Sequence, residues 1–197
     1  RLWVVNPDND SVTVFDTVAN SRVQEIPVGV APRTLARAAD GNVWVANRDS
    51  ATISVIDPAS LTVVRTIALP RASQPWGLVG ASDGRMYVSL EAAGRLLKLD
   101  GSGATLATLD VGANPRHLAV SGDASRVLVS RFITPPLAGE ATAVVDTASG
   151  GGEVLAVNTA TMAVAGTVRL RHSDRNDNEV QGSGIPNYLG PAVIAQR

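Results

Sequence analysis

The most informative part of the sequence is Val43-Trp44-Val45-Ala46-Asn47, followed by Ile53-Ser54-Val55-Ile56-Asp57. Both runs are apolar and end at Asn or Asp, which is typical of short β-strands that end at turns. Runs like the first begin at residues 2, 43, 86 and 127, at spacings of 41, 43 and 41 residues. In the first three copies a second run ends in Asp ten residues after the first run ends. A period of about 42 residues with four short strands predicts the blade of a β-propeller.

A third repeated feature is a Pro with a Leu three residues later. It occurs at Pro32/Leu35, Pro75/Leu78, Pro115/Leu118 and Pro186/Leu189. In the first three copies an Asp beside a Gly follows the Pro by eight residues, which indicates a tight turn before the next strand. For the second copy, these signals predict strands over 34–39, 43–48, 52–57 and 62–68. No segment carries a helical period.

The same residues resemble the YVTN β-propeller repeat. Val43-Trp44-Val45-Ala46-Asn47, Ser54-Val55-Ile56-Asp57 and Val63-Val64-Arg65-Thr66-Ile67 are similar to it, and Gly112-Ala113-Asn114-Pro115-Arg116 is similar to the family's Gly-x-x-Pro-x segment. The resemblance implies a seven-bladed propeller that is periplasmic, secreted or on the cell surface. Some members of that family continue into a haem-peroxidase-like region, whose haem signatures this sequence does not contain.

The repeats predict an all-β fold, a segment of a β-propeller with four-stranded antiparallel blades over residues 1–197. We expect a partial blade at 1–28, blades at 32–69, 75–111 and 115–170 with an insertion at 133–150, and the start of another blade at 186–197. This amounts to about four and a half blades, whereas seven would need roughly 300 residues. We therefore expect the remaining blades to come from the same parent chain, or from another copy.

The composition narrows the possible functions. The chain has 197 residues, 45% of them hydrophobic, a formal net charge of -1 and no cysteine. A near-zero charge gives no basis for nucleic-acid binding, and no apolar stretch reaches the ~18 residues of a membrane span. The lack of cysteine excludes disulfides, thiolate zinc sites and covalent haem attachment within this segment. No nucleophile elbow, P-loop or dinucleotide fingerprint is present, so we predict no catalytic residue.

The residues after the repeated Pro are the first candidate binding site. They are Arg33, Trp76, Arg116 and Asn187, and His117 follows the third of them. Because the innermost strand of each blade starts at this Pro, these side chains should meet at one rim of the central channel. Such a set could bind an anion or another polar ligand. The alternative is packing between blades, with the arginines donating to backbone carbonyls of a neighbour.

Two stretches interrupt the repeat, at 133–150 and 171–184. The first is rich in Ala, Gly, Pro and Thr, and we interpret it as a tolerated surface insertion. The second contains Asp174, Asn176, Asp177, Asn178 and Glu179, whose oxygen atoms could bind calcium. The alternative is a solvated polar loop. The two histidines, His117 and His172, are interpreted as structural residues in preference to ligands of a shared metal.

Two functions remain open at this stage. The first is an extracytoplasmic scaffold or binding module that acts on a ligand or protein partner through its faces and inserted loops. The second is the propeller part of a haem- or quinone-linked redox enzyme or electron-transfer protein. A lactonase-type hydrolase is disfavoured, because the sequence shows no set of acids and histidines that would hold its metal in the channel.

Overall fold

The computed structural model describes residues 1–132, 150–171, 176–178 and 182–183. These residues form β-strands and turns, apart from one short 3-10 segment at Pro7–Asn9. The first sheet has three strands, β1 (Leu2–Asn6), β2 (Ser11–Asp16) and β3 (Ser21–Pro27).

Three four-stranded antiparallel sheets follow. The second sheet is β4 (Pro32–Arg37), β5 (Val43–Asn47), β6 (Thr52–Asp57) and β7 (Thr62–Ala68); the third is β8 (Pro75–Gly80), β9 (Met86–Leu90), β10 (Arg95–Leu99) and β11 (Thr105–Asp110). The fourth is β12 (Pro115–Val120), β13 (Arg126–Arg131), β14 (Gly150–Asn158) and β15 (Ala163–Arg171). A short pair, β16 (Asn176–Asn178) and β17 (Gly182–Ser183), comes last among the described strands.

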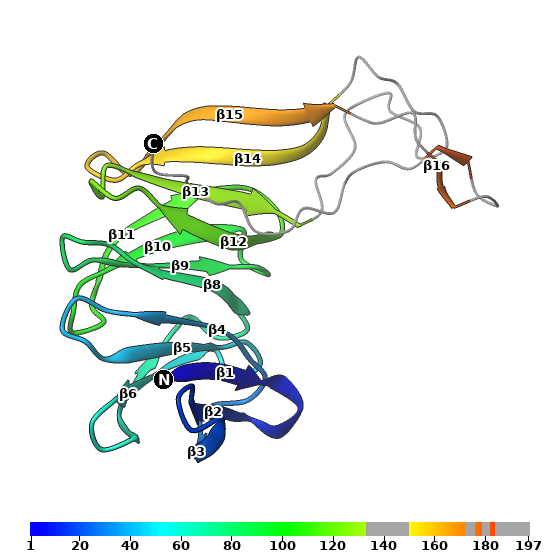
Figure 1. Cartoon of the computed structure of the whole chain (residues 1–197). Coiled ribbons are helices and arrows are strands. Elements are labelled where there is room, and N and C mark those ends of the chain that lie inside the picture. The colour runs from blue at the N-terminus through cyan, green and yellow to red at the C-terminus, as the bar shows by residue number, and fades with distance from the viewer. Residues whose placement is uncertain (133–149, 172–175, 179–181, 184–197) are drawn as a thin grey trace.

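The sheets succeed one another in chain order, as Figure 1 shows. In each of the three complete sheets the strands pair in sequence order, and the first strand of one sheet contacts the first strand of the next, β4 with β8 and β8 with β12. This arrangement confirms the predicted all-β propeller class with four-stranded antiparallel blades. The described chain is a partial propeller.

The hydrophobic core lies between neighbouring sheets. Strands β5 and β9 are buried at every position, which is why their sequences are nearly continuous apolar runs. One cluster joins Trp44 and Ile53 of the second sheet to Met86 and Leu97 of the third. The outer strand β7 instead alternates between exposed and half-buried positions, since only one of its faces packs against a neighbour.

The inner strands approach closely at two glycines of β8. A Cβ atom at Gly77 would overlap the backbone oxygen of Arg116 on β12, and one at Gly80 would overlap the backbone oxygen of Arg37 on β4. Only a residue without a side chain fits at these contacts, because three strands from three sheets converge there.

Some boundaries differ from the prediction. The inner strand of the second sheet was expected over 34–39 and spans Pro32–Arg37 instead, because Pro32 can still pair through its carbonyl, opposite Asn47. Strand β14 begins at Gly150, within the predicted insertion, where it lies opposite Arg171 of β15. In the described part of the chain, no helix is long and apolar enough to cross a membrane.

Candidate functional site

Each complete sheet begins with the same backbone arrangement. The residue before the repeated Pro has a left-handed conformation, with φ of 52° at Ala31, 51° at Gln74 and 56° at Asn114. Its carbonyl accepts a hydrogen bond from the residue that follows the second strand; the donors are the N–H groups of Arg48 (3.1 Å), Glu91 (2.9 Å) and Phe132 (2.8 Å). This bond fastens the start of the inner strand to the end of its neighbour.

The residue after the Pro lies at an irregularity in the strand pairing. The register shifts between Pro32 and Thr34, between Pro75 and Leu78, and between Pro115 and His117. Proline has no N–H to donate to the ladder, so regular pairing begins only after it. An irregularity of this kind redirects the side chain at its centre. Arg33, Trp76 and Arg116 occupy these three positions.

Trp76 brings these side chains together. The guanidinium carbon of Arg33 lies 4.9 Å from the centroid of the Trp76 ring, and that of Arg116 lies 3.9 Å from it. Arg48, at the end of β5, is 5.9 Å from the same centroid. These are cation–π distances, and they join side chains from three sheets around one indole. The predicted meeting of Arg33, Trp76 and Arg116 at one end of the inner strands is therefore observed.

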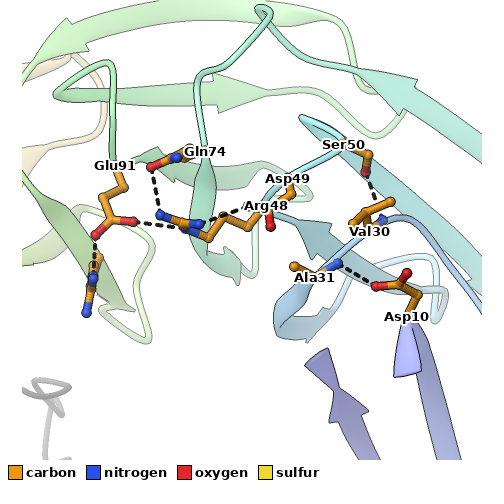
Figure 2. Close-up of polar contacts among 9 residues, drawn as sticks. Asp10, Val30, Ala31, Arg48, Asp49, Ser50, Gln74 and Glu91 are labelled. Atoms are coloured by element: carbon orange, nitrogen blue, oxygen red, sulfur yellow. Dashed lines mark hydrogen bonds and ion pairs between the residues drawn. The ribbon is translucent and has the colours of Figure 1, made fainter. Parts of the chain in front are cut away.

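A buried carboxylate, Glu91, holds two of the arginines. It is 7% exposed. Its oxygens accept hydrogen bonds from Nε of Arg116 at 2.5 Å and from Nε of Arg48 at 3.3 Å. Figure 2 shows the Arg48 guanidinium between Glu91, Gln74 and Asp49. It donates to the side-chain oxygen of Gln74 at 2.9 Å and to the carboxylate of Asp49 at 2.8 Å. Glu91 thus links the second, third and fourth sheets, and its burial is compensated by two cations.

Arg33 differs from the other two arginines. Its Nε is buried and has no hydrogen-bond partner, and no ion pair of Arg33 occurs among the described residues. A buried donor without an acceptor destabilises the folded state by about 1–3 kcal/mol. We call Arg33, Arg48, Trp76, Glu91 and Arg116 the rim cluster. In the part of the chain that the structure describes, one of its three guanidiniums has no carboxylate partner.

The surrounding loops are also tied together at this end. The carboxylate of Asp10 accepts a hydrogen bond from the N–H of Ala31 at 2.8 Å, and the hydroxyl of Ser50 accepts one from the N–H of Val30 at 3.1 Å (Figure 2). The connection between the first two sheets is thus bound from both sides. Its backbone carries Arg33 two residues further on.

His117 lies on β12, beside Arg116. It is half-buried, and burial, together with the nearby charge of Arg116, lowers the pKa of its imidazole. Both effects favour the neutral form of the imidazole. Of the predicted rim residues, Asn187 lies outside the described residues. So do Asp174 and Glu179 of the predicted calcium loop, while Asn176, Asp177 and Asn178 are described only as the backbone of β16.

The sequence analysis missed Arg48, Gln74, Glu91 and Phe132. Arg48, Glu91 and Phe132 each directly follow the second strand of their sheet. Extending the comparison of the repeats by one residue would therefore have predicted that they lie at the same end. The alternative to ligand binding was that the rim arginines pack between blades, and Arg116 does so. Its guanidinium packs against the rings of Trp76 and Phe132 and pairs with Glu91, and it donates to no backbone carbonyl among the described residues.

A second carboxylate cluster lies within the fourth sheet. Glu153 of β14 accepts from Nη1 of Arg131 at 2.7 Å and from Nε of Arg169 at 2.9 Å. Arg131 also donates from Nε to the backbone oxygen of Ala113 at 2.9 Å. Within the described ranges, no group of three or more His, Asp or Glu side chains could hold a metal ion.

Comparisons with known proteins identify the architecture. No protein-family model and no curated protein matches the chain. Among solved structures, hydrazine synthase of Kuenenia stuttgartiensis is similar over 86% of this chain and 46% of its own, with a TM-score of 0.72 and 20% identity. Virginiamycin B lyase from Staphylococcus aureus is similar over 86% and 51%, with a TM-score of 0.64 and 13% identity. Dihydro-heme d1 dehydrogenase NirN is similar over 82% and 33%, with a TM-score of 0.58 and 22% identity.

These neighbours are β-propeller proteins, and at such identities they show the fold alone. The chain spans about half of the first two structures and a third of the last.

Proposed function

We propose that this chain is part of an extracytoplasmic β-propeller of the YVTN-repeat kind that serves as a binding scaffold. In this proposal the binding surface is the end of the channel that carries the rim cluster. The observation that supports it most directly is the uncompensated guanidinium of Arg33, held beside an indole where three sheets meet. The location and the family rest on the resemblance of the sequence to the YVTN repeat.

The rigidity of this end also supports a binding role. Glu91 ties three sheets together, and the left-handed residues before each Pro are bonded to the neighbouring strand. Side chains on such a backbone are held in position before a ligand binds. Less conformational entropy is therefore lost on binding.

The two non-repeating segments also start from this end. Arg131, which precedes the first of them, lies opposite Pro115, and Gly150, which follows it, lies opposite Arg171. Long connections on a rigid scaffold often carry function. The proposal therefore assigns ligand selection to the rim cluster together with the connections at its end of the channel.

Nuclear magnetic resonance can test where the scaffold binds. The chain is titrated separately with benzoate, glucose and benzylamine, which represent anionic, neutral polar and cationic ligands. We expect at least one probe to shift the Trp76 indole and the Arg Nε–H signals of the rim cluster. Arg37 and Arg126, at the opposite end of their strands, serve as internal references. If none of the probes shifts the rim, or if the shifts gather at the opposite end, the proposal fails.

The redox alternative stays a prediction and can be tested on the same chain. Hemin and a soluble quinone are titrated into the protein, and absorbance is recorded. A saturable spectral change at one equivalent that disappears in Trp76→Ala would favour the redox interpretation over a plain scaffold. Unchanged spectra would leave the scaffold as the better interpretation.

A further inference from the structure

The charges of the rim cluster do not balance. Arg48 and Arg116 share the carboxylate of Glu91, and Arg48 also pairs with Asp49. Arg33 completes the set with a third guanidinium and no acidic partner among the described residues. From this imbalance, and on the basis of the function proposed above, we infer that Arg33 is the anchoring residue of an anion site whose ligand group is a carboxylate.

The chemistry of the guanidinium favours a carboxylate. Its planar fork of N–H donors matches the two oxygens of a carboxylate, and such charge-assisted pairs are stronger than neutral hydrogen bonds. The Trp76 ring at 4.9 Å and the burial of Nε remove water from one side of Arg33. Because solvent does not reach the buried Nε, a carboxylate would bind the terminal Nη groups of this half-buried side chain.

The magnitude of the charge selects between anions. Three guanidiniums face two carboxylates in the contacts of the cluster, which leaves one positive charge. A carboxylate neutralises it. A phosphate monoester, which carries up to two negative charges at pH 7, would place an extra negative charge near Glu91. The site should therefore bind carboxylates more tightly than inorganic phosphate.

The connection between the first and second sheets lies next to Arg33 and is bound by a carboxylate, Asp10, that does not pair with Arg33 among the described residues. Asp10 comes from the first sheet and directs a carboxylate oxygen to the N–H of Ala31, two residues before Arg33. The carbonyl of Ala31 accepts from the N–H of Arg48. Asp10 thus holds the backbone at the start of β4 and makes no ion pair with Arg33 among the described contacts. We assign it a positioning role.

The decisive experiment measures carboxylate binding to the whole chain and to matched variants. The probes are benzoate, inorganic phosphate, an uncharged peptide capped at both ends, and the same peptide with glutamates added. Arg33→Gln removes the charge, Arg33→Lys keeps the charge without the fork, and Arg37→Gln removes the same charge at the far end of the same strand. Binding is measured by calorimetry, and the site is located by the Arg Nε–H resonances.

We expect benzoate to bind at Arg33 more tightly than phosphate. Arg33→Gln should weaken this binding at least about tenfold, in line with the loss of a charge-assisted hydrogen bond. The affinity of Arg33→Lys for benzoate should lie between those of the parent chain and Arg33→Gln. Arg37→Gln should change the affinity less than about twofold. The melting temperature of Arg33→Gln should change little, because removal of the uncompensated buried donor offsets the loss of the cation–π contact with Trp76. An unchanged melting temperature would show that the loss of binding does not come from a loss of folding.

The arms of the experiment also separate two sources of carboxylate. If the glutamate peptide binds more tightly than benzoate, the ligand group belongs to an acidic segment of a protein partner; the reverse order indicates a small carboxylic acid. Either order supports the inference. Stronger binding of phosphate, or benzoate binding that Arg33→Gln leaves unchanged, overturns it. In that case the scaffold proposal still stands if the neutral or cationic probe shifts the rim signals, and both fail if no probe does.

Discussion

Glu91 and Glu153 are both buried carboxylates that bind two arginines, yet their partners come from different places. Arg48 and Arg116 reach Glu91 from the sheets on either side, whereas Arg131 and Arg169 reach Glu153 from the two strands that flank it in its own sheet. The same chemistry therefore joins blades at the rim and joins strands within the fourth sheet.

The two clusters also differ in their access to water. The side chains of Arg48 and Arg116 are 24% and 18% exposed, whereas the partners of Glu153 are unequal, with Arg131 12% and Arg169 54% exposed. An exposed arginine regains its hydration when its partner is removed, and a buried one does not. Because one of the two partners of Glu153 is exposed and neither partner of Glu91 is, we predict that the Glu91 cluster stabilises the fold more than the Glu153 cluster.

The largest effect is expected at Glu91. Glu91→Gln leaves two enclosed guanidiniums without a counter-charge, and we expect the free energy of unfolding to fall by about 3 kcal/mol. Urea denaturation measures it. Adding Arg48→Gln to this variant should destabilise it less than Arg48→Gln destabilises the parent chain, because the ion pair is already lost. Additive losses would show that Glu91 does not couple these sheets.

Gly77 tests the same contact between blades without any charge. Gly77→Ala forces a methyl group against the backbone oxygen of Arg116, and overpacking of this kind destabilises by about 2 kcal/mol. Gly166→Ala on β15 is the matched control, since a Cβ atom there would meet nothing within 4 Å. Equal melting temperatures for the two variants would contradict the close approach of β8 and β12.

Glu153→Gln is the counterpart within a blade. One arginine of this cluster is already in water, so we expect a loss of about 1.5 kcal/mol, in the range of a single hydrogen bond to a charged group. The denaturation curves of Glu153→Gln and Glu91→Gln should be recorded side by side. A larger loss for Glu153→Gln would reverse the comparison drawn above.

The smallest effect concerns a carboxylate whose partners are all within one turn. Hydrogen bonds from the Ser121 hydroxyl, and then from Ser125, lower the pKa of Asp123 to about 2. Because this folded-state pKa lies below the ordinary value of 3.8, the stabilisation is complete above about pH 4 and is lost as the pH falls towards 2. Asp123→Asn should flatten the acid limb of a plot of stability against pH. A limb identical to that of the parent chain would show that this turn contributes nothing to acid unfolding.

Much of the rim could be predicted from the sequence because the repeat carries positional information. Pro32, Pro75 and Pro115 begin equivalent strands, so the residues that follow them must lie at one end. Glu91 escaped notice because it has no counterpart of its own kind: the equivalent positions hold Arg48 and Phe132. Comparing repeats identifies the residues that the copies share. The ion pairs of Glu91 depend on positions at which the copies differ.

The strands, the four-stranded sheets and the grouping of Arg33, Trp76 and Arg116 follow from the repeat in the sequence, because period and strand pairing place each residue within its own blade. The packing of the blades, by contrast, brings Glu91 to Arg48 and Arg116 and leaves Arg33 without an acidic partner among the described residues. Those partners are 43 and 25 residues from Glu91 and belong to other sheets. Their meeting depends on how closely and at what angle the blades pack, and the glycines of β8 and the indole of Trp76 set that packing in three dimensions.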